Sequence, residues 1–126
     1  MGPIVALKHD EGVRLDAACL VGLVTRMGDR GAEQVVAESL DEMALCLARM
    51  ELDYGEGEMS AICRRTRKLG RLASEVGMVS LSRVAEDVGA CAARGDMVAF
   101  AATWSRLQRI ADRSLGAIFA LRGSAM

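Results

Sequence analysis

Four basic residues near the middle of the sequence are spaced so that a helix would bring them together on one face. They are Arg64, Arg67, Lys68 and Arg71, referred to below as the cationic stripe. Like charges three or four residues apart on a helix repel each other by roughly a few tenths of a kcal/mol per pair. A helix selected for stability alone would mix the two signs. The stripe therefore predicts a surface for an anion or an acidic partner, although a solvated face of an amphipathic helix would show the same pattern.

The sequence holds few groups suited to ordinary catalysis. Its single histidine, His9, lies in a predicted N-terminal tail, far in sequence from the cysteines at positions 19, 46, 63 and 91. A cysteine nucleophile needs a nearby base, and a structural metal site needs a cluster of ligands. There is no Cys-x-x-Cys pair and no glycine-rich phosphate loop. We expect no catalytic residue, no metal and no cofactor, and we interpret the cysteines as small buried hydrophobic side chains.

Five helical segments separated by glycine-bearing breaks would position these groups. Four of them cover about residues 15–27, 31–52, 58–76 and 97–121, and the remaining one lies between Ser80 and Gly95. Gly28 and Gly95 are suited to helix C-termini because glycine tolerates a positive φ. Asp29, Ser80 and Asp96 are suited to N-cap positions, where a side-chain oxygen accepts hydrogen bonds from free N–H groups.

Apolar residues recur at spacings of four and three residues within these segments, as in helices that pack against neighbours in a bundle. The residues expected to face the core are Val36, Leu40, Met43, Leu47, Met50, Ile62, Thr66, Leu69, Ala73, Val76, Leu81, Val84, Val88, Cys91, Ala92, Met97, Phe100, Trp104, Leu107, Ala111 and Ile118. The connections are short, which implies antiparallel neighbours. The pattern predicts an all-α, up-and-down antiparallel four-helix bundle with an additional short N-terminal helix. No strand-like alternation rises above the helical signal.

Length and composition fit one helical domain. The chain has 126 residues, 52% of them apolar but only 3% aromatic, so Leu, Val, Met and Ala must build the core. We expect a flexible tail over residues 1–12, the bundle over 13–121 and a frayed end over 122–126. A net charge of −1 argues against nucleic-acid binding, although the first part of the chain is acidic and the rest basic. Neither a signal-peptide layout nor a membrane-spanning apolar run is present, so we expect a cytoplasmic protein without a membrane partner.

A series of short motifs runs through the third and fourth segments in a fixed order. Residues 67–77 read Arg-Lys-Leu-Gly-Arg-Leu-Ala-Ser-Glu-Val-Gly, followed by Leu81, Glu86 and the sequence Ala-Arg-Gly-Asp at 93–96. In order and spacing these motifs resemble those of histidine-containing phosphotransfer (HPt) domains. That family carries a stretch like His-x-Leu-Lys-Gly, then Ala, Leu-Gly, an acidic residue and a closing Arg-x-Gly-Asp. The resemblance covers about residues 13–120 and implies an HPt-like bundle of a bacterial two-component phosphorelay.

The chain departs from the family at the residue on which phosphotransfer depends. When the leucine, alanine and glycine at 69, 73 and 77 are aligned with the family pattern, Arg67 replaces the phosphorylatable histidine. The family's lysine becomes Gly70 and its glycine becomes Arg71. A shifted alignment places Thr66 at the histidine position, and neither frame supplies an imidazole. An arginine stays protonated and has no free lone pair, so we expect no phosphotransfer through this helix.

The resemblance therefore implies a degenerate HPt-like module that binds a response-regulator receiver domain, or a histidine kinase, without relaying phosphate. The residues expected to contact the partner are Arg64, Arg67, Lys68, Gly70 and Arg71. Receiver domains present an acidic pocket that the cationic stripe would complement, although the bulk of Arg71 could equally block docking. Two alternatives stay open: an active phosphotransferase that uses His9, and a structural helical interaction domain. We expect a monomer rather than a homodimer.

Overall fold

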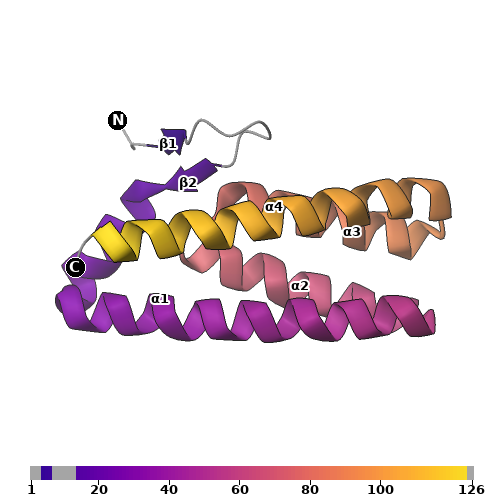
Figure 1. The fold of residues 1–126 in the computed structure, drawn as a ribbon, viewed down its shortest axis with the longest axis horizontal. Coiled ribbons are helices and arrows are strands. Elements are labelled where there is room, and N and C mark those ends of the chain that lie inside the picture. The colour runs from indigo at the N-terminus through magenta and orange to yellow at the C-terminus, as the bar shows by residue number, and fades with distance from the viewer. Residues whose placement is uncertain (1–3, 7–13, 125–126) are drawn as a thin grey trace.

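Four long helices that alternate in direction account for most of the chain. The computed structural model describes the backbone of residues 4–6 and 14–124 and the side chains of residues 15–116. The helices are α1 (Ala17–Glu56), α2 (Met59–Glu75), α3 (Val79–Arg94) and α4 (Met97–Ser124). Figure 1 shows them packed lengthwise, with each helix antiparallel to the one before it. The predicted all-α, up-and-down bundle is confirmed.

A glycine divides α1 into the two parts that the sequence predicted. Gly28 has φ 78° and ψ 170°, a conformation outside the helical range. Residues that have a Cβ rarely adopt this positive φ, whereas glycine does so at little cost. A short N-terminal helix therefore precedes the break, and the long bundle helix follows it.

The connections between α2, α3 and α4 agree in part with the predicted caps. Gly95 ends α3 in the left-handed conformation, with φ 72°. Asp96 Oδ1 then accepts a hydrogen bond from the Ala99 amide at 3.1 Å, as predicted. The predicted cap at Ser80 is wrong, because α3 begins at Val79 and its N-cap residue is Met78. Ser80 lies within the first turn of α3.

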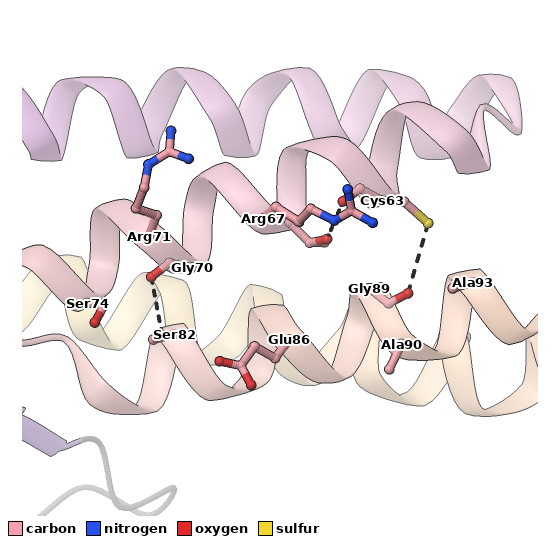
Figure 2. Close-up of a pocket in the computed structure, with 11 residues that line it drawn as sticks. Cys63, Arg67, Gly70, Arg71, Ser74, Ser82, Glu86, Gly89, Ala90 and Ala93 are labelled. Carbon is pink, nitrogen blue, oxygen red and sulfur yellow. Dashed lines mark hydrogen bonds between the residues drawn. The ribbon is translucent and has the colours of Figure 1, made fainter.

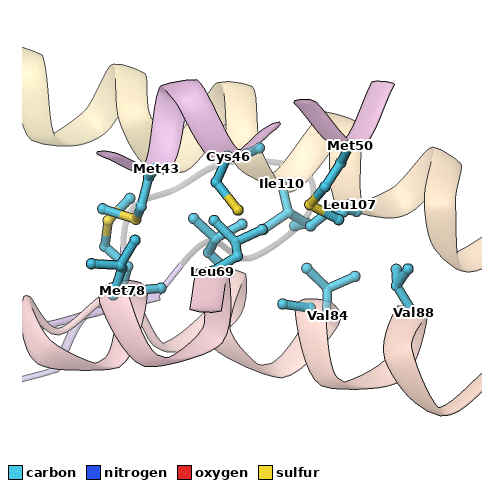
Figure 3. Packing of buried hydrophobic residues seen from close by; sticks show 14 of the residues in the cluster. Met43, Cys46, Met50, Leu69, Met78, Val84, Val88, Leu107 and Ile110 are labelled. Carbon is cyan, nitrogen blue, oxygen red and sulfur yellow. The ribbon is translucent and has the colours of Figure 1, made fainter. Parts of the chain in front are cut away.

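The predicted core residues meet in one cluster between the four helices. Figure 3 shows part of it, where Met43 and Met50 of α1, Leu69 of α2 and Leu107 of α4 converge. Leu47 and Ala92 are only partly buried at its edge. Met97 was predicted to face the core but is 53% exposed, because it is the first residue of α4 and lies beyond the end of the cluster. The Ile118 side chain lies outside the described residues. No helix in the described part of the chain is long and apolar enough to cross a bilayer.

A short hairpin, which the sequence analysis did not predict, lies against one end of the bundle (Figure 1). Strand β1 (Ile4–Ala6) pairs antiparallel with β2 (Arg14–Asp16). Leu15 is buried and forms a bridge to Met78 in the α2–α3 connection. The Asp16 amide donates to the carbonyl of Gly77 at 2.7 Å, and the Asp16 side chain caps α1. Strands of three residues are too short to show a period-two pattern in the sequence.

Candidate partner-binding site

One face of α2 is apolar and packs into the core, and this packing leaves the opposite face, which carries the cationic stripe, on the surface. The core face carries Ile62, Thr66, Leu69, Ala73 and Val76, and each of these side chains is buried. All four cations of the stripe are on the opposite face and exposed to solvent. This arrangement follows from the helical period of 3.6 residues, which separates apolar and basic positions onto two sides. The predicted common orientation of the stripe is confirmed.

Among the side chains that the structure describes, no carboxylate forms an ion pair with a residue of the cationic stripe. Within residues 15–116, no carboxylate oxygen lies within 4.0 Å of a nitrogen of Arg64, Arg67, Lys68 or Arg71. The nearby basic residue that does form an ion pair is Arg65, which lies outside the stripe. Exposed cations without a partner keep their full charge available to an approaching anion.

A groove runs along the junction of α2 and α3, and part of the stripe forms its wall. This α2–α3 groove has a volume of about 550 Å³. The residues that line it are Cys63, Thr66, Arg67, Gly70, Arg71, Ser74, Ser82, Glu86, Gly89, Ala90 and Ala93. Figure 2 shows Arg67 and Arg71 on the α2 side and Glu86 and Ala90 on the α3 side. The groove is a concave surface that small residues leave open and charged residues border.

Gly89 lets α2 and α3 approach closely beneath the groove. A Cβ placed on Gly89 would lie 2.6 Å from Oγ1 of Thr66, closer than atoms in contact allow. That oxygen is buried, and its hydroxyl donates to the Cys63 carbonyl at 2.8 Å. The sequence analysis missed Gly89, because its role depends on the distance between two helices. A glycine in the middle of a predicted helix was the available signal, since it marks a possible close approach.

Gly70 was predicted to belong to the site and does line the groove, but its surroundings are looser than those of Gly89. A Cβ on Gly70 would lie 3.8 Å from the Ser82 carbonyl oxygen, an ordinary contact. The Ser82 hydroxyl donates to the Gly70 carbonyl at 3.2 Å, and this bond ties α3 to α2. A second contact runs from the Cys63 thiol to the Gly89 carbonyl at 3.9 Å. The walls of the groove are therefore held by direct contacts between the two helices.

The stripe divides between two grooves. Arg67, Gly70 and Arg71 line the α2–α3 groove. Lys68 instead lines a smaller groove of about 260 Å³ between α1 and α2, together with Arg49 and Cys46. Arg64 lines neither of these two. The predicted partner-binding residues thus span the exposed ridge of α2 and do not converge on one pocket.

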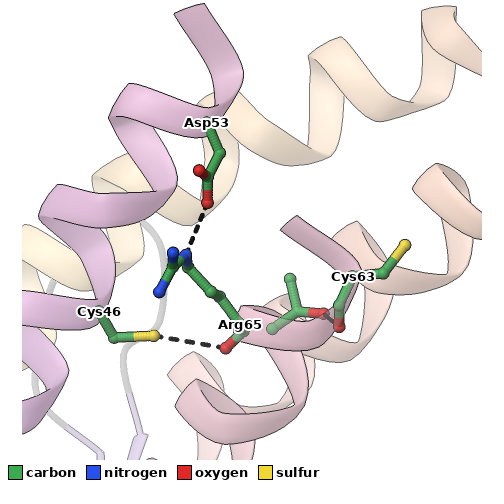
Figure 4. Close-up of polar contacts among 5 residues, drawn as sticks. Cys46, Asp53, Cys63 and Arg65 are labelled. Carbon is green, nitrogen blue, oxygen red and sulfur yellow. Dashed lines mark hydrogen bonds and ion pairs between the residues drawn. The ribbon is translucent and has the colours of Figure 1, made fainter. Parts of the chain in front are cut away.

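A partly buried ion pair stabilises the junction of α1 and α2. Nε of Arg65 lies 2.6 Å from Oδ2 of Asp53, and only 12% of the Asp53 side chain is exposed. Figure 4 shows this contact beside Cys46, whose thiol donates to the Arg65 carbonyl at 3.4 Å. Burial raises the pKa of the Cys46 thiol, although the charges of Lys68 and Arg65 oppose the shift. A buried neutral thiol is a poor nucleophile.

The two residues proposed for the histidine position lie in different environments. Arg67 is exposed and lines the α2–α3 groove. Thr66, the residue in the shifted alignment, is only 4% exposed and its hydroxyl is bonded within α2. Of these two residues, Arg67 is the one whose side chain is exposed to solvent. His9 lies outside the described residues.

The comparisons with known proteins bear on the fold. No protein-family model matches the chain, and no curated protein matches it. The structure does match the crystal structure of histidine-containing phosphotransfer protein B (HptB) from Pseudomonas aeruginosa PAO1, with a TM-score of 0.79. The match covers 87% of this chain and 95% of that chain at 17% sequence identity. The chain therefore has an HPt-like helical-bundle fold.

Proposed function

We propose that this protein is an HPt-like signalling module that binds the receiver domain of a two-component protein without carrying phosphate itself. The observation that carries the proposal is Arg67, an exposed guanidinium beside a groove in an HPt-like bundle, with no ion-pair partner among the described side chains. Arg67 occupies the position at which the motifs of the resembling family place their phosphorylatable histidine.

An arginine at this position can bind an acidic partner but cannot take part in phosphotransfer as a histidine does. Phosphotransfer from an aspartyl phosphate needs a neutral nitrogen with a free lone pair to attack the phosphorus. A guanidinium is protonated throughout the physiological pH range and offers five N–H donors but no lone pair. It can bind carboxylate or phosphate oxygens, yet in its protonated form it has no lone pair with which to attack the phosphorus of an aspartyl phosphate.

Electrostatics supports an acidic partner surface such as the pocket of a receiver domain. The stripe presents four cations on one helix face without a carboxylate among the described side chains to neutralise them. Such a field attracts negatively charged surfaces and raises the rate of encounter, and salt weakens it. Binding should therefore tighten at low ionic strength.

The first test of the proposal is binding to purified receiver domains from the host. We expect titration calorimetry at low salt to detect a complex with at least one of them. Replacing all four stripe residues by glutamine should weaken that complex at least tenfold, because each lost contact removes part of the attraction. Arg83→Gln is the matched control, since Arg83 is exposed on α3 and lines neither groove. Binding that survives the fourfold substitution would favour a structural interaction domain instead.

The second test concerns phosphate. The protein is incubated with phosphorylated receiver domains and then analysed for acid-labile phosphate. We expect none on the wild-type chain. Labelled protein would contradict the proposal, and loss of that label in His9→Ala would assign the phosphate to the N-terminal histidine.

A further inference from the structure

Glu86 gives the α2–α3 groove a second charge, of the opposite sign to the stripe. Of the described residues that line this groove, Glu86 is the one that carries a carboxylate. The side chain is exposed and lies on the α3 wall, across from Arg67 (Figure 2). A partner that enters the groove therefore meets positive charge from α2 and negative charge from α3.

The two charges do not cancel each other. No nitrogen of Arg67 or Arg71 comes within 4.0 Å of a Glu86 oxygen in the described structure. Each group is instead exposed to solvent, and Arg67 and Glu86 both line the same groove. Opposite charges that face the same space without pairing can bind complementary groups on a partner.

The polarity of the groove is fixed by the fold. The Ser82 hydroxyl bonded to the Gly70 carbonyl holds α3 against α2 close to Arg71. Buried side chains from both helices, including Leu69 and Ala85, pack beneath the groove. Because the two walls cannot slide freely, a partner must match their charges in a given orientation.

We infer that the α2–α3 groove orients its partner, taking a receiver segment that presents a carboxylate toward Arg67 and a basic side chain toward Glu86. This inference rests on the proposed receiver binding and adds the second charge and the orientation to it. A uniformly acidic surface would be repelled by Glu86, so this residue would select among acidic partners.

The direction in which neutralising Glu86 changes the affinity distinguishes this inference from the simpler view that the surface only attracts negative charge. If the surface only attracts negative charge, neutralising Glu86 removes a repulsion and tightens the complex. If Glu86 binds a basic group of the partner, the same change weakens the complex. The two views therefore predict opposite shifts in the dissociation constant.

The experiment measures the affinity of Glu86→Gln and Glu86→Lys for a receiver domain that binds the wild-type protein. We expect Glu86→Gln to weaken binding roughly two- to fivefold, the range for an exposed charge pair. Glu86→Lys should weaken it further, because attraction becomes repulsion. Asp87→Asn is the matched control: it changes net charge equally, but Asp87 lies outside the groove and faces Arg106 of α4. It should bind like the wild type.

A double variant tests whether Glu86 acts on the partner or through Arg67. If each residue contacts its own partner group, the fold losses of Arg67→Gln and Glu86→Gln should multiply in the combined protein. Unchanged or tighter binding by Glu86→Gln would overturn the inference while leaving the proposed function intact. A wild-type protein that binds no receiver domain would overturn both, so the two failures are distinguishable.

Discussion

The side of α2 that meets α1 and the side that meets α3 use charge in different ways. Toward α1, Arg65 forms a short ion pair with the buried carboxylate of Asp53. Toward α3, Arg67 and Glu86 border a groove, and neither forms an ion pair with another described side chain. Two arginines separated by a single residue thus serve different purposes. A charge that is paired and partly buried holds helices together, whereas exposed and unpaired charges are available for recognition.

The largest effect should come from removing the paired arginine. Arg65→Met leaves the Asp53 carboxylate buried without a counterion, which should lower the free energy of unfolding by about 2–3 kcal/mol. Arg67→Met, the matched change on the opposite side, should alter it by less than about 0.5 kcal/mol. Urea unfolding followed by circular dichroism measures both. Equal losses of unfolding free energy in the two variants would show that Arg65 and Arg67 do not differ in their contribution to stability.

A smaller effect should separate the two glycines of the α2–α3 groove. Gly89→Ala forces a Cβ against Thr66 Oγ1, and we expect a net loss of about 1 kcal/mol after the gain in helix propensity. Gly70→Ala meets only ordinary contacts and should stabilise by about 0.5 kcal/mol.

Thermal unfolding measures the stability of both glycine variants. Adding Gly89→Ala to a Thr66→Ala protein should cost little or no stability, because the oxygen with which the new Cβ would clash is then absent. A stabilised Gly89→Ala protein would mean that the two helices separate easily, and the groove would then not be preformed.

The smallest effect should appear in the pH dependence of stability. Because burial raises the pKa of the Cys46 thiol, the folded chain holds this proton at a pH where the unfolded chain releases it. The stabilising contribution is fully present below the unfolded pKa of about 8.5 and is lost as pH rises through the folded value. Cys46→Ala should therefore flatten the decline in unfolding free energy above about pH 8.

Cys63→Ala is the control for this pH measurement, since Cys63 is only partly buried and lines the other groove. The comparison uses the slope of stability against pH, because the cavity left by either substitution changes the level at every pH. A slope unchanged by Cys46→Ala would contradict the expected role of its buried thiol.

The sequence was sufficient to predict the bundle and the two faces of α2. Both depend on helical periodicity, which is a local property, and each predicted core residue of α2 is buried. The break at Gly28 and the cap at Asp96 were also predictable, since glycine and aspartate have strong positional preferences at helix ends.

Features that depend on contacts between helices were not predictable in the same way. The pairing of Arg65 with Asp53 requires the register of α1 against α2. The role of Gly89 can be recognised only when the distance between α3 and Thr66 of α2 is known. The sequence analysis noted Glu86 as a family-like acidic residue, but only the fold places it across a groove from Arg67. The prediction that Met97 faces the core was wrong, because the apolar pattern of α4 extends beyond the end of the core.

The hydrogen bond from the Asp16 amide to the Gly77 carbonyl joins residues far apart in the sequence. A Cβ on Gly77 would lie only 2.6 Å from the Asp16 carbonyl oxygen, so the close approach requires glycine there. Breaking this contact together with the Leu15–Met78 bridge would release the start of α1 from the α2–α3 connection without opening the helices themselves. The rate at which the Asp16 amide exchanges its proton with heavy water should therefore report local detachment of the N-terminal segment. Amides in the middle of α2 should exchange more slowly, through opening of the whole bundle.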